Sequence, residues 1–209
     1  MWSRFIEFLF PRKCLGCKSE DSALCGSCKA KLVAVFLKRY DGKYYDELMQ
    51  IFRYGNSKIL KILLKKIKYK FDEQLIEILD SHLRIVAKKI PKDQILAYIP
   101  LHKSRLSFRG FNQSKLIAEL IMKHGDFTMM ECVVRIKKTV QQAGLSRNER
   151  IKNLNGAFEV KPGFKKLIEG RKFLLIDDVA STGSTLDEAA KVLKEAGALR
   201  VDGLVLARG

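Results

Sequence analysis

Two adjacent acids and a hydroxyl-rich turn stand together in the C-terminal part of the sequence. Asp177 and Asp178 follow an apolar run, and the turn after them consists of Ala180, Ser181, Thr182, Gly183, Ser184 and Thr185. Backbone N–H groups and hydroxyls in such a turn can surround a phosphate, which the positive end of a following helix also favours. If the apolar run is a strand, the acids lie at its carboxyl end, where open α/β sheets bind ligands. There they can reach sugar hydroxyls or a hydrated divalent cation, so the segment predicts a ribose-phosphate site.

The run from Leu174 to Leu186 resembles the 5-phosphoribosyl-1-pyrophosphate (PRPP) signature of type I phosphoribosyltransferases at every position. The alternative is an ordinary strand-to-helix turn with a surface acid pair, because short motifs also occur by chance. Purine-salvage enzymes resemble this signature but carry a third acid as general base three residues after the pair. Ser181 occupies that position here, so the resemblance disfavours purine salvage.

Four cysteines near the N-terminus form two C-x-x-C pairs: Cys14, Cys17, Cys25 and Cys28. Two such pairs can place four thiolates around Zn²⁺ in a closed structural site, with no position left for a catalytic water. Redox chemistry needs only one pair, and disulfides are disfavoured in a reducing cytosol. Since few apolar residues lie between the pairs, we expect the metal to supply most of the folding energy of this module. The fifth cysteine, Cys132, is predicted to be a buried strand thiol.

The chain is strongly basic. Its 209 residues include 40 Lys and Arg against 23 Asp and Glu, a formal net charge of +17. PRPP is a polyanion but does not need seventeen spare charges, so a second, extended anion such as nucleic acid or an anionic membrane surface is expected.

Residues 51–70 contain seven basic residues and no acid, and they predict an amphipathic helix. Lys58, Lys61, Lys65 and Lys68 recur at helical spacing, apart from the apolar positions. Such a face can follow a phosphate backbone, although a solvated face on a core-packing helix has the same pattern. Tyr54, just before it, adds a stacking side chain that favours a single strand. The lysine helix and the phosphate turn consist of different residues, so the two proposed sites are compatible.

Composition and pattern define the architecture. A hydrophobic content of 47% fits a globular protein, and no apolar run reaches the ~18 residues that cross a bilayer. Residues 46–90 are predicted to be mostly helical. Strands near 95–100, 173–178 and 199–206 alternate with helices at 113–124 and after the turn, which predicts a parallel sheet covered by helices. The last of these helices is expected to begin with a capping box at residues 185–188 and to end at Gly197.

Two further segments have functional character. Lys103 and Arg105 follow a strand, together with Leu101 and His102, and can supply cations to a pyrophosphate group. The segment from Arg135 to Arg150, which includes Arg147, is too polar for a core and is predicted to be a lid over the leaving group.

Taken together, the paired cysteines, PLHxxRLxxRGFNQS, TxxQxGLSRxER and LLIDDVxSTGSTL resemble the ComF competence family, of the ComFC type, from residue 10 to residue 208. The resemblance implies a type I phosphoribosyltransferase core at residues 46–209 and a zinc module at 1–45. It also implies PRPP contacts at the acid pair and the turn, pyrophosphate contacts at residues 101–105, and a flexible loop at 137–150.

These observations leave two functions open. One is a cytoplasmic DNA-uptake protein of natural transformation, peripheral to the inner membrane, that binds PRPP with Mg²⁺ and single-stranded DNA beside the uptake machinery. The other is an active phosphoribosyltransferase with an unidentified acceptor and no direct role in DNA handling. A PRPP-sensing transcription regulator is disfavoured because no helix-turn-helix is evident.

Overall fold

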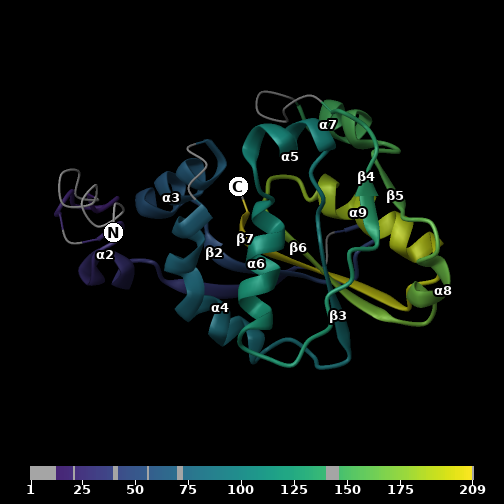
Figure 1. Cartoon of the computed structure of the whole chain (residues 1–209), viewed down its shortest axis with the longest axis horizontal. Helices are drawn as coiled ribbons and strands as arrows, with labels where there is room; N and C mark the ends of the chain where they lie inside the picture. The colour runs from purple at the N-terminus through teal and green to yellow at the C-terminus, as the bar shows by residue number, and fades with distance from the viewer. Residues whose placement is uncertain are drawn as a thin grey trace, which may run out of the picture.

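A five-stranded mixed sheet forms the centre of the molecule (Figure 1). The computed structural model describes residues 13–20, 22–39, 42–55, 57–69, 73–139 and 146–208. The strand order is β1-β2-β7-β6-β3, and all neighbours are parallel except β1 and β2. The strands are β1 (Ala34–Arg39), β2 (Leu48–Arg53), β3 (Gln94–Tyr98), β6 (Lys172–Ala180) and β7 (Arg200–Arg208).

The central strands are buried on both faces. In β7, residues 201–207 are all buried, and in β6 the run 173–176 is buried as well. Nearly continuous apolar runs are typical of parallel strands covered on both sides, because no face of the sheet meets water. The predicted strands at 95–100, 173–178 and 199–206 correspond to β3, β6 and β7, and the predicted fold class is confirmed.

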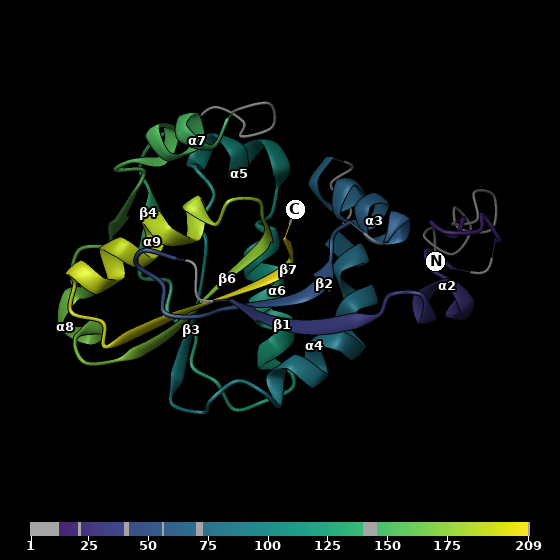
Figure 2. The ribbon, with the colours of Figure 1, turned by 180° about the vertical axis from the view of Figure 1, so that it is seen from behind.

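Helices cover both faces of the sheet. One face carries α3 (Lys58–Tyr69), the 3₁₀ helix η1 (Glu73–Leu79), α4 (Asp80–Ala87) and α6 (Gln113–Met122), which share one apolar cluster. The opposite face carries α9 (Ser184–Glu195), seen from behind in Figure 2. A two-stranded antiparallel sheet, β4 (Val133–Arg135) with β5 (Phe158–Val160), lies against α9 with the short helices α7 (Arg147–Leu154) and α8 (Lys165–Ile168).

Two local details differ from the predictions. Residues 46–90 are mostly helical, as predicted, through α3, η1 and α4, but β2 lies at their start between β1 and β7. Residues 48–52 are buried without alternation, so the strand lacks the period that would identify it in the sequence. The predicted capping box also fails: α9 begins at Ser184 after Gly183, and no side chain caps it. The predicted left-handed glycine after that helix is confirmed, because Gly197 has φ of +93°.

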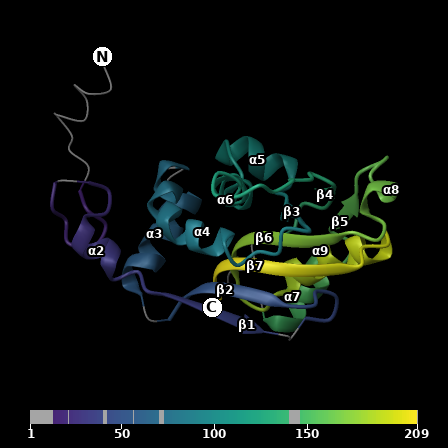
Figure 3. The ribbon, with the colours of Figure 1, turned by 90° about the horizontal axis from the view of Figure 1, so that it is seen from below.

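The cysteine-bearing segment lies at one end of the molecule, beside α3 and beyond the edge of the sheet (Figure 3). It contains the short helix α2 (Gly26–Ala30) and then continues into β1. The backbone carbonyl of Leu32 accepts a hydrogen bond from His82 Nε2 of α4 at 2.9 Å. The boundary at residue 45 stays a prediction, and in the structure the five-stranded sheet begins at residue 34.

Candidate functional site

The two acids lie at the carboxyl end of β6, as predicted for a ligand site. Asp177 Oδ1 accepts hydrogen bonds from Ser114 Oγ and from the Asp178 amide, each at 2.9 Å. Desolvation and the neighbouring Asp178 carboxylate raise the pKa of Asp177 to about 7, and Lys68 counteracts them in part. The Asp177 residue is partly exposed, whereas Asp178 is 8% exposed. The pair therefore places two carboxyl groups, one of them with a raised pKa, at a sheet edge that solvent reaches.

The turn after the acids is compact. Thr182 Oγ1 and Ser184 Oγ lie 2.6 Å apart, and the Ser184 amide donates to Thr182 Oγ1 at 3.4 Å. Residues 179–186 and Asp177 surround a hollow of about 10 Å³, which has room for one water molecule at most. A phosphate would not fit inside this hollow and would have to lie at its mouth, where helix α9 begins. A larger cavity of about 470 Å³ lies beside residues 182–184 and is also lined by residues 42–45.

Gly183 brings this turn close to Tyr45. Its φ is +82°, and a Cβ at this position would stand 2.9 Å from Tyr45 Oη. Gly163 has nearly the same φ of +83°, but a Cβ added there would meet nothing within 4 Å. Replacing Gly163 by alanine would therefore strain the backbone as much as replacing Gly183, but the new methyl group would meet no neighbour.

We expect Gly183→Ala to lower the free energy of unfolding by more than Gly163→Ala does. Both changes cost about 1 kcal/mol from the left-handed backbone, and the contact with Tyr45 adds about 1–2 kcal/mol at Gly183 alone. Thermal unfolding of both variants measures the difference. Equal melting temperatures would contradict the close packing of Tyr45 on the turn.

The acids that were predicted to cap α9 connect it to other segments instead. Asp187 Oδ1 accepts the amides of Lys43 and Tyr44 at 2.8 and 2.7 Å, and Glu188 Oε1 accepts the Gly156 amide at 2.7 Å. The first turn of α9 therefore fixes residues 43–44 and the start of β5 around the turn.

Helix α3 has the predicted two-sided character. The side chains of Leu60, Leu63, Leu64 and Ile67 are at most 3% exposed, while Lys58, Lys61 and Lys65 are exposed. Tyr54 packs partly against the core, and Lys61 Nζ lies 5.6 Å from the centre of its ring. A base that stacks on Tyr54 would have to share this ring with Lys61.

Lys68 joins the basic helix to the acid pair. Its Nζ lies 3.0 Å from Asp178 Oδ2, with exposed side-chain fractions of 28% and 11% for the two partners. The predicted lysine helix and phosphate site consist of different residues, but this ion pair brings them into contact. Sequence spacing cannot reveal the pair, because the two residues come from elements distant in the chain that meet only on the folded sheet.

The two cations predicted in the loop after β3 have different surroundings. Lys103 begins helix α5 (Lys103–Arg109), and His102 caps that helix by accepting the Ser104 amide at Nδ1. Lys103 is exposed and Leu101 is partly exposed. Arg105 Nη2 donates a hydrogen bond to the Thr139 carbonyl oxygen at 2.7 Å. This guanidinium therefore contacts the first part of the predicted lid.

The predicted lid has a buried beginning. Arg135 and Thr139 are 6% and 7% exposed, and Arg135 Nη2 donates to Thr139 Oγ1. Desolvation and the nearby Arg105 lower the pKa of Arg135 to about 10. Arg135 is thus part of the scaffold, although it is polar. Residues 140–145 and the side chain of Arg147 lie outside the described part of the structure.

Two residues that sequence reasoning did not select position the acid pair. Ser114 donates to Asp177 Oδ1. Asn112 caps α6 through the Ser114 amide at 2.9 Å, and its Nδ2 donates to the Ile99 carbonyl oxygen at 3.0 Å. An Asn directly before an apolar helical pattern is an N-cap signal, and it could have located this contact.

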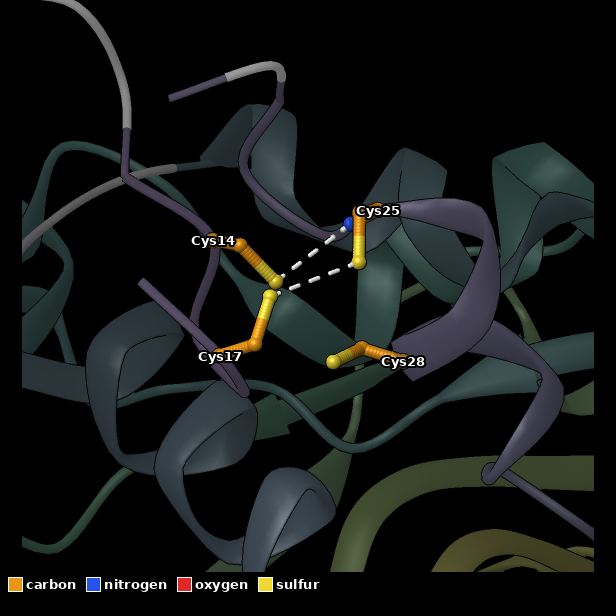
Figure 4. A group of neighbouring side chains, drawn as sticks. All are labelled: Cys14, Cys17, Cys25 and Cys28. Carbon is orange, nitrogen blue, oxygen red and sulfur yellow. Dashed lines mark hydrogen bonds between the residues drawn. The ribbon is translucent and has the colours of Figure 1, made fainter. Parts of the chain in front are cut away.

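The four paired cysteines form one cluster (Figure 4). Their Sγ atoms all lie within 4.8 Å of one another, close to the ~3.8 Å separation of thiolates at the corners of a zinc tetrahedron. Cys14 Sγ accepts the Gly16 and Cys25 amides at 3.4 Å. Hydrogen bonds from the backbone of Cys17 and Cys25 lower the pKa of Cys14 to about 5, whereas burial raises that of Cys28 to about 12. The cluster fits a metal ion. Cys132 lies apart from it, fully buried.

Among the described residues, no helix combines the length and the apolar character needed to cross a lipid bilayer.

Comparison with known proteins agrees with the fold. The phosphoribosyl transferase domain family model matches residues 116–209, the part of the chain that contains the acid pair and the turn. Competence protein F of Haemophilus influenzae is 29% identical over 212 residues, which cover 93% of this chain and 90% of that protein.

Two further relatives match a shorter part. DNA utilization protein YhgH of Escherichia coli is 35% identical over 64% of this chain and 56% of its own length. Competence protein ComFC of Bacillus subtilis is 31% identical over 69% of this chain and 57% of its own. In these two matches the aligned segment is a little more than half the length of the relative.

The fold and the site define a phosphoribosyltransferase-like protein with a four-cysteine cluster near its N-terminus. The relatives refine this class, since they include competence proteins that match most of the chain. Over most of its length the chain is similar to ComF-type competence proteins.

Proposed function

We propose that this protein acts in DNA uptake during natural transformation, and that it binds PRPP with Mg²⁺ and single-stranded DNA. The observation that carries the proposal is the position of Asp177 and Asp178 at the carboxyl end of β6, directly before a hydroxyl-rich turn and the start of α9. Ligands of open α/β sheets bind at this edge. The names of the relatives, which refer to competence and DNA utilization, support the process.

In the proposed complex, Asp177 and Asp178 hold the ribose hydroxyls, and the turn holds the 5′-phosphate at the amino end of α9. Carboxylate and phosphate oxygens are the ligands that Mg²⁺ prefers. When bound, the ion would neutralise part of the negative charge of the pyrophosphate group. Lys103, Arg105 and Arg147 are the proposed cations for the pyrophosphate group. Such cations stabilise a leaving group as negative charge develops on it, so the same site has the parts for ribosyl transfer.

The cysteine cluster is proposed to hold a structural Zn²⁺, because four thiolates without an open position form a closed site. We place the protein in the cytoplasm at the inner membrane, where the uptake machinery delivers the strand. An active phosphoribosyltransferase with an unidentified acceptor is the second candidate, favoured by the cations beside the pyrophosphate region.

Titration calorimetry of the full chain tests the PRPP site, with Mg²⁺ present throughout. We expect PRPP to bind more tightly than inorganic pyrophosphate, because only PRPP offers a sugar to the carboxylates. If pyrophosphate binds equally well, or if neither binds, the proposed ribose-phosphate site is rejected.

The DNA interaction is tested by its dependence on salt. A plot of log affinity against log salt concentration has a negative slope, and each lost phosphate contact to a single strand makes that slope shallower by about 0.7. We expect Lys61→Gln with Lys65→Gln to reduce the slope by about 1.4, measured by fluorescence anisotropy of a labelled oligothymidine. The matched control replaces Lys165 and Lys166, two exposed lysines of α8, and should keep the parent slope. The same reduction in both variants would mean that the charge of the whole chain, not α3, binds the strand.

A further inference from the structure

Both carboxylate oxygens of Asp178 are already engaged by the protein. Oδ1 accepts the Val179 amide at 2.6 Å, and Oδ2 pairs with Lys68 Nζ at 3.0 Å. The hydrogen bond to Oδ1 comes from the backbone amide of the next residue, so it cannot be displaced without unfolding the end of the strand. The Lys68 side chain is flexible and 28% exposed. Each carboxylate oxygen can accept a further hydrogen bond, but a second cation at Oδ2, such as the Mg²⁺ of the proposed complex, would compete with Lys68 for this oxygen.

Lys68 also belongs to the basic face of α3. It follows Lys61 and Lys65 by seven and three positions on the same helix, and spacings of three, four and seven residues place side chains on one side of a helix. A phosphate chain that follows the exposed lysines along α3 reaches Lys68 at the end nearest the acid pair. This ammonium group can therefore pair with either of two anions, a carboxylate of the sugar site or a phosphate of the strand.

We propose that Lys68 is a shared counter-cation that couples the sugar-phosphate site to the single-strand site, an inference that rests on the proposed function. In the unliganded protein Lys68 neutralises Asp178. PRPP bound with Mg²⁺ at Asp178 breaks the pair and releases Lys68 to the strand, and a strand phosphate at Lys68 breaks the pair and exposes Asp178 to PRPP and Mg²⁺. Each ligand alone breaks the pair, but when both bind the pair is broken only once.

The consequence is positive coupling between the two ligands. Whichever ligand binds first bears the cost of separating Lys68 from Asp178, so the second binds more tightly than it would alone. Linkage requires that the two ligands raise each other's affinity by the same factor. Repulsion between the phosphates of PRPP and those of the strand opposes this effect. Because that repulsion does not depend on Lys68, a variant at this position separates the two contributions.

The experiment compares the affinity of the full chain for a labelled oligothymidine with and without saturating PRPP and Mg²⁺. The ratio of the two affinities is measured for the parent, for Lys68→Met and for the matched control Lys65→Met. Lys65 is an exposed lysine one turn earlier on the same helix, so both variants remove one charge from the same face. Anisotropy reports the strand, and calorimetry reports PRPP on each protein alone.

We expect the ratio to be about five-fold higher in the parent than in Lys68→Met, the lower end of ordinary coupling between sites. Lys65→Met should weaken strand binding but keep the ratio of the parent. If PRPP and the strand both bind and the parent and Lys68→Met give the same ratio, the shared counter-cation is refuted while the proposed function stands. If the parent binds only one of the two ligands, the proposed function fails and the coupling fails with it.

Discussion

Asp177→Asn is expected to make the unliganded protein more stable and to weaken PRPP binding strongly. Asn keeps an acceptor for Ser114 and for the Asp178 amide, but it removes a carboxylate whose charged form is disfavoured by desolvation and by Asp178. The gain in the free energy of unfolding should be about 1–3 kcal/mol at pH 8, because each unit of pKa shift corresponds to about 1.4 kcal/mol and the group is partly exposed. Functional groups held in unfavourable surroundings commonly show this exchange of stability for function.

The pH dependence has a definite sign. The pKa of Asp177 is raised from 3.8 to about 7 in the folded protein, so the folded state holds a proton that the unfolded state has lost between these values. The contribution of Asp177 to stability is therefore fully present below pH 4 and is lost as the pH rises through 7. We expect the variant and the parent to melt at similar temperatures near pH 4 and to differ most at pH 8.

Two controls complete this test. Asp93→Asn removes an acid whose pKa is lowered by Lys172, so it should leave the protein slightly less stable at pH 8, not more stable. Titration calorimetry with PRPP and Mg²⁺ then measures binding, with a loss of at least about 100-fold expected when a charged hydrogen-bond partner of the sugar is removed. An Asp177→Asn protein that binds PRPP like the parent would show that this carboxylate does not hold the ribose.

The sequence predicts the elements whose pattern is local and strong. Helix α6 follows an Asn cap and a regular apolar spacing, and β6 and β7 are apolar runs bounded by charged or turn residues. Helix α3 is predicted by its leucines and lysines for the same reason. Strand β2 escapes prediction because its side chains are buried on both faces of the sheet, Met49 and Ile51 in one apolar cluster and Leu48 in the other. No period therefore distinguishes it from a helix in a short window.

The candidate site is predictable as far as it consists of consecutive residues. The acid pair and the turn are one segment, and a strand followed by a helix places them at the sheet edge without further information. The contacts that tune the pair come from other elements: Ser114 from α6 and Lys68 from α3. The roles of Asp187 and Glu188 are also set by tertiary structure, since these acids bind amides of segments distant in the chain instead of their own helix. Helix-cap rules consider neighbouring residues alone and cannot anticipate such partners.

The cysteine cluster has a second source of stability that the sequence does not reveal. Leu15, Leu24 and Leu32 belong to the same buried apolar cluster as the leucines of α3. The backbone approaches α3 so closely at Gly16 that a Cβ there would lie 3.2 Å from Ile59 Cδ1 and 2.4 Å from Cys28 Sγ. A change in the cluster should therefore be transmitted to α3, on whose outer face the single strand is proposed to bind.

Loss of the metal is expected to unfold the segment that bears the four cysteines. We expect Cys28→Ser to reduce bound zinc from about one equivalent per chain to none, because a closed site with three thiolates loses most of its affinity. Trypsin should then cut at Lys29 and Lys31, which lie in and directly after helix α2. Metal analysis and mass spectrometry of the fragments measure both effects, and a strong chelator applied to the parent should reproduce them.

The matched control for this variant is Cys132→Ala, which changes another fully buried cysteine outside the cluster. It should keep one zinc per chain and resist cleavage at Lys29 and Lys31. Since the cluster supports α3, Cys28→Ser should also weaken oligothymidine binding several-fold while PRPP binding at the acid pair changes less, because a single-strand contact depends on the position of each lysine. If the zinc-depleted protein keeps its resistance to trypsin, the leucine contacts with α3 suffice to hold the segment, and the metal has another role than folding.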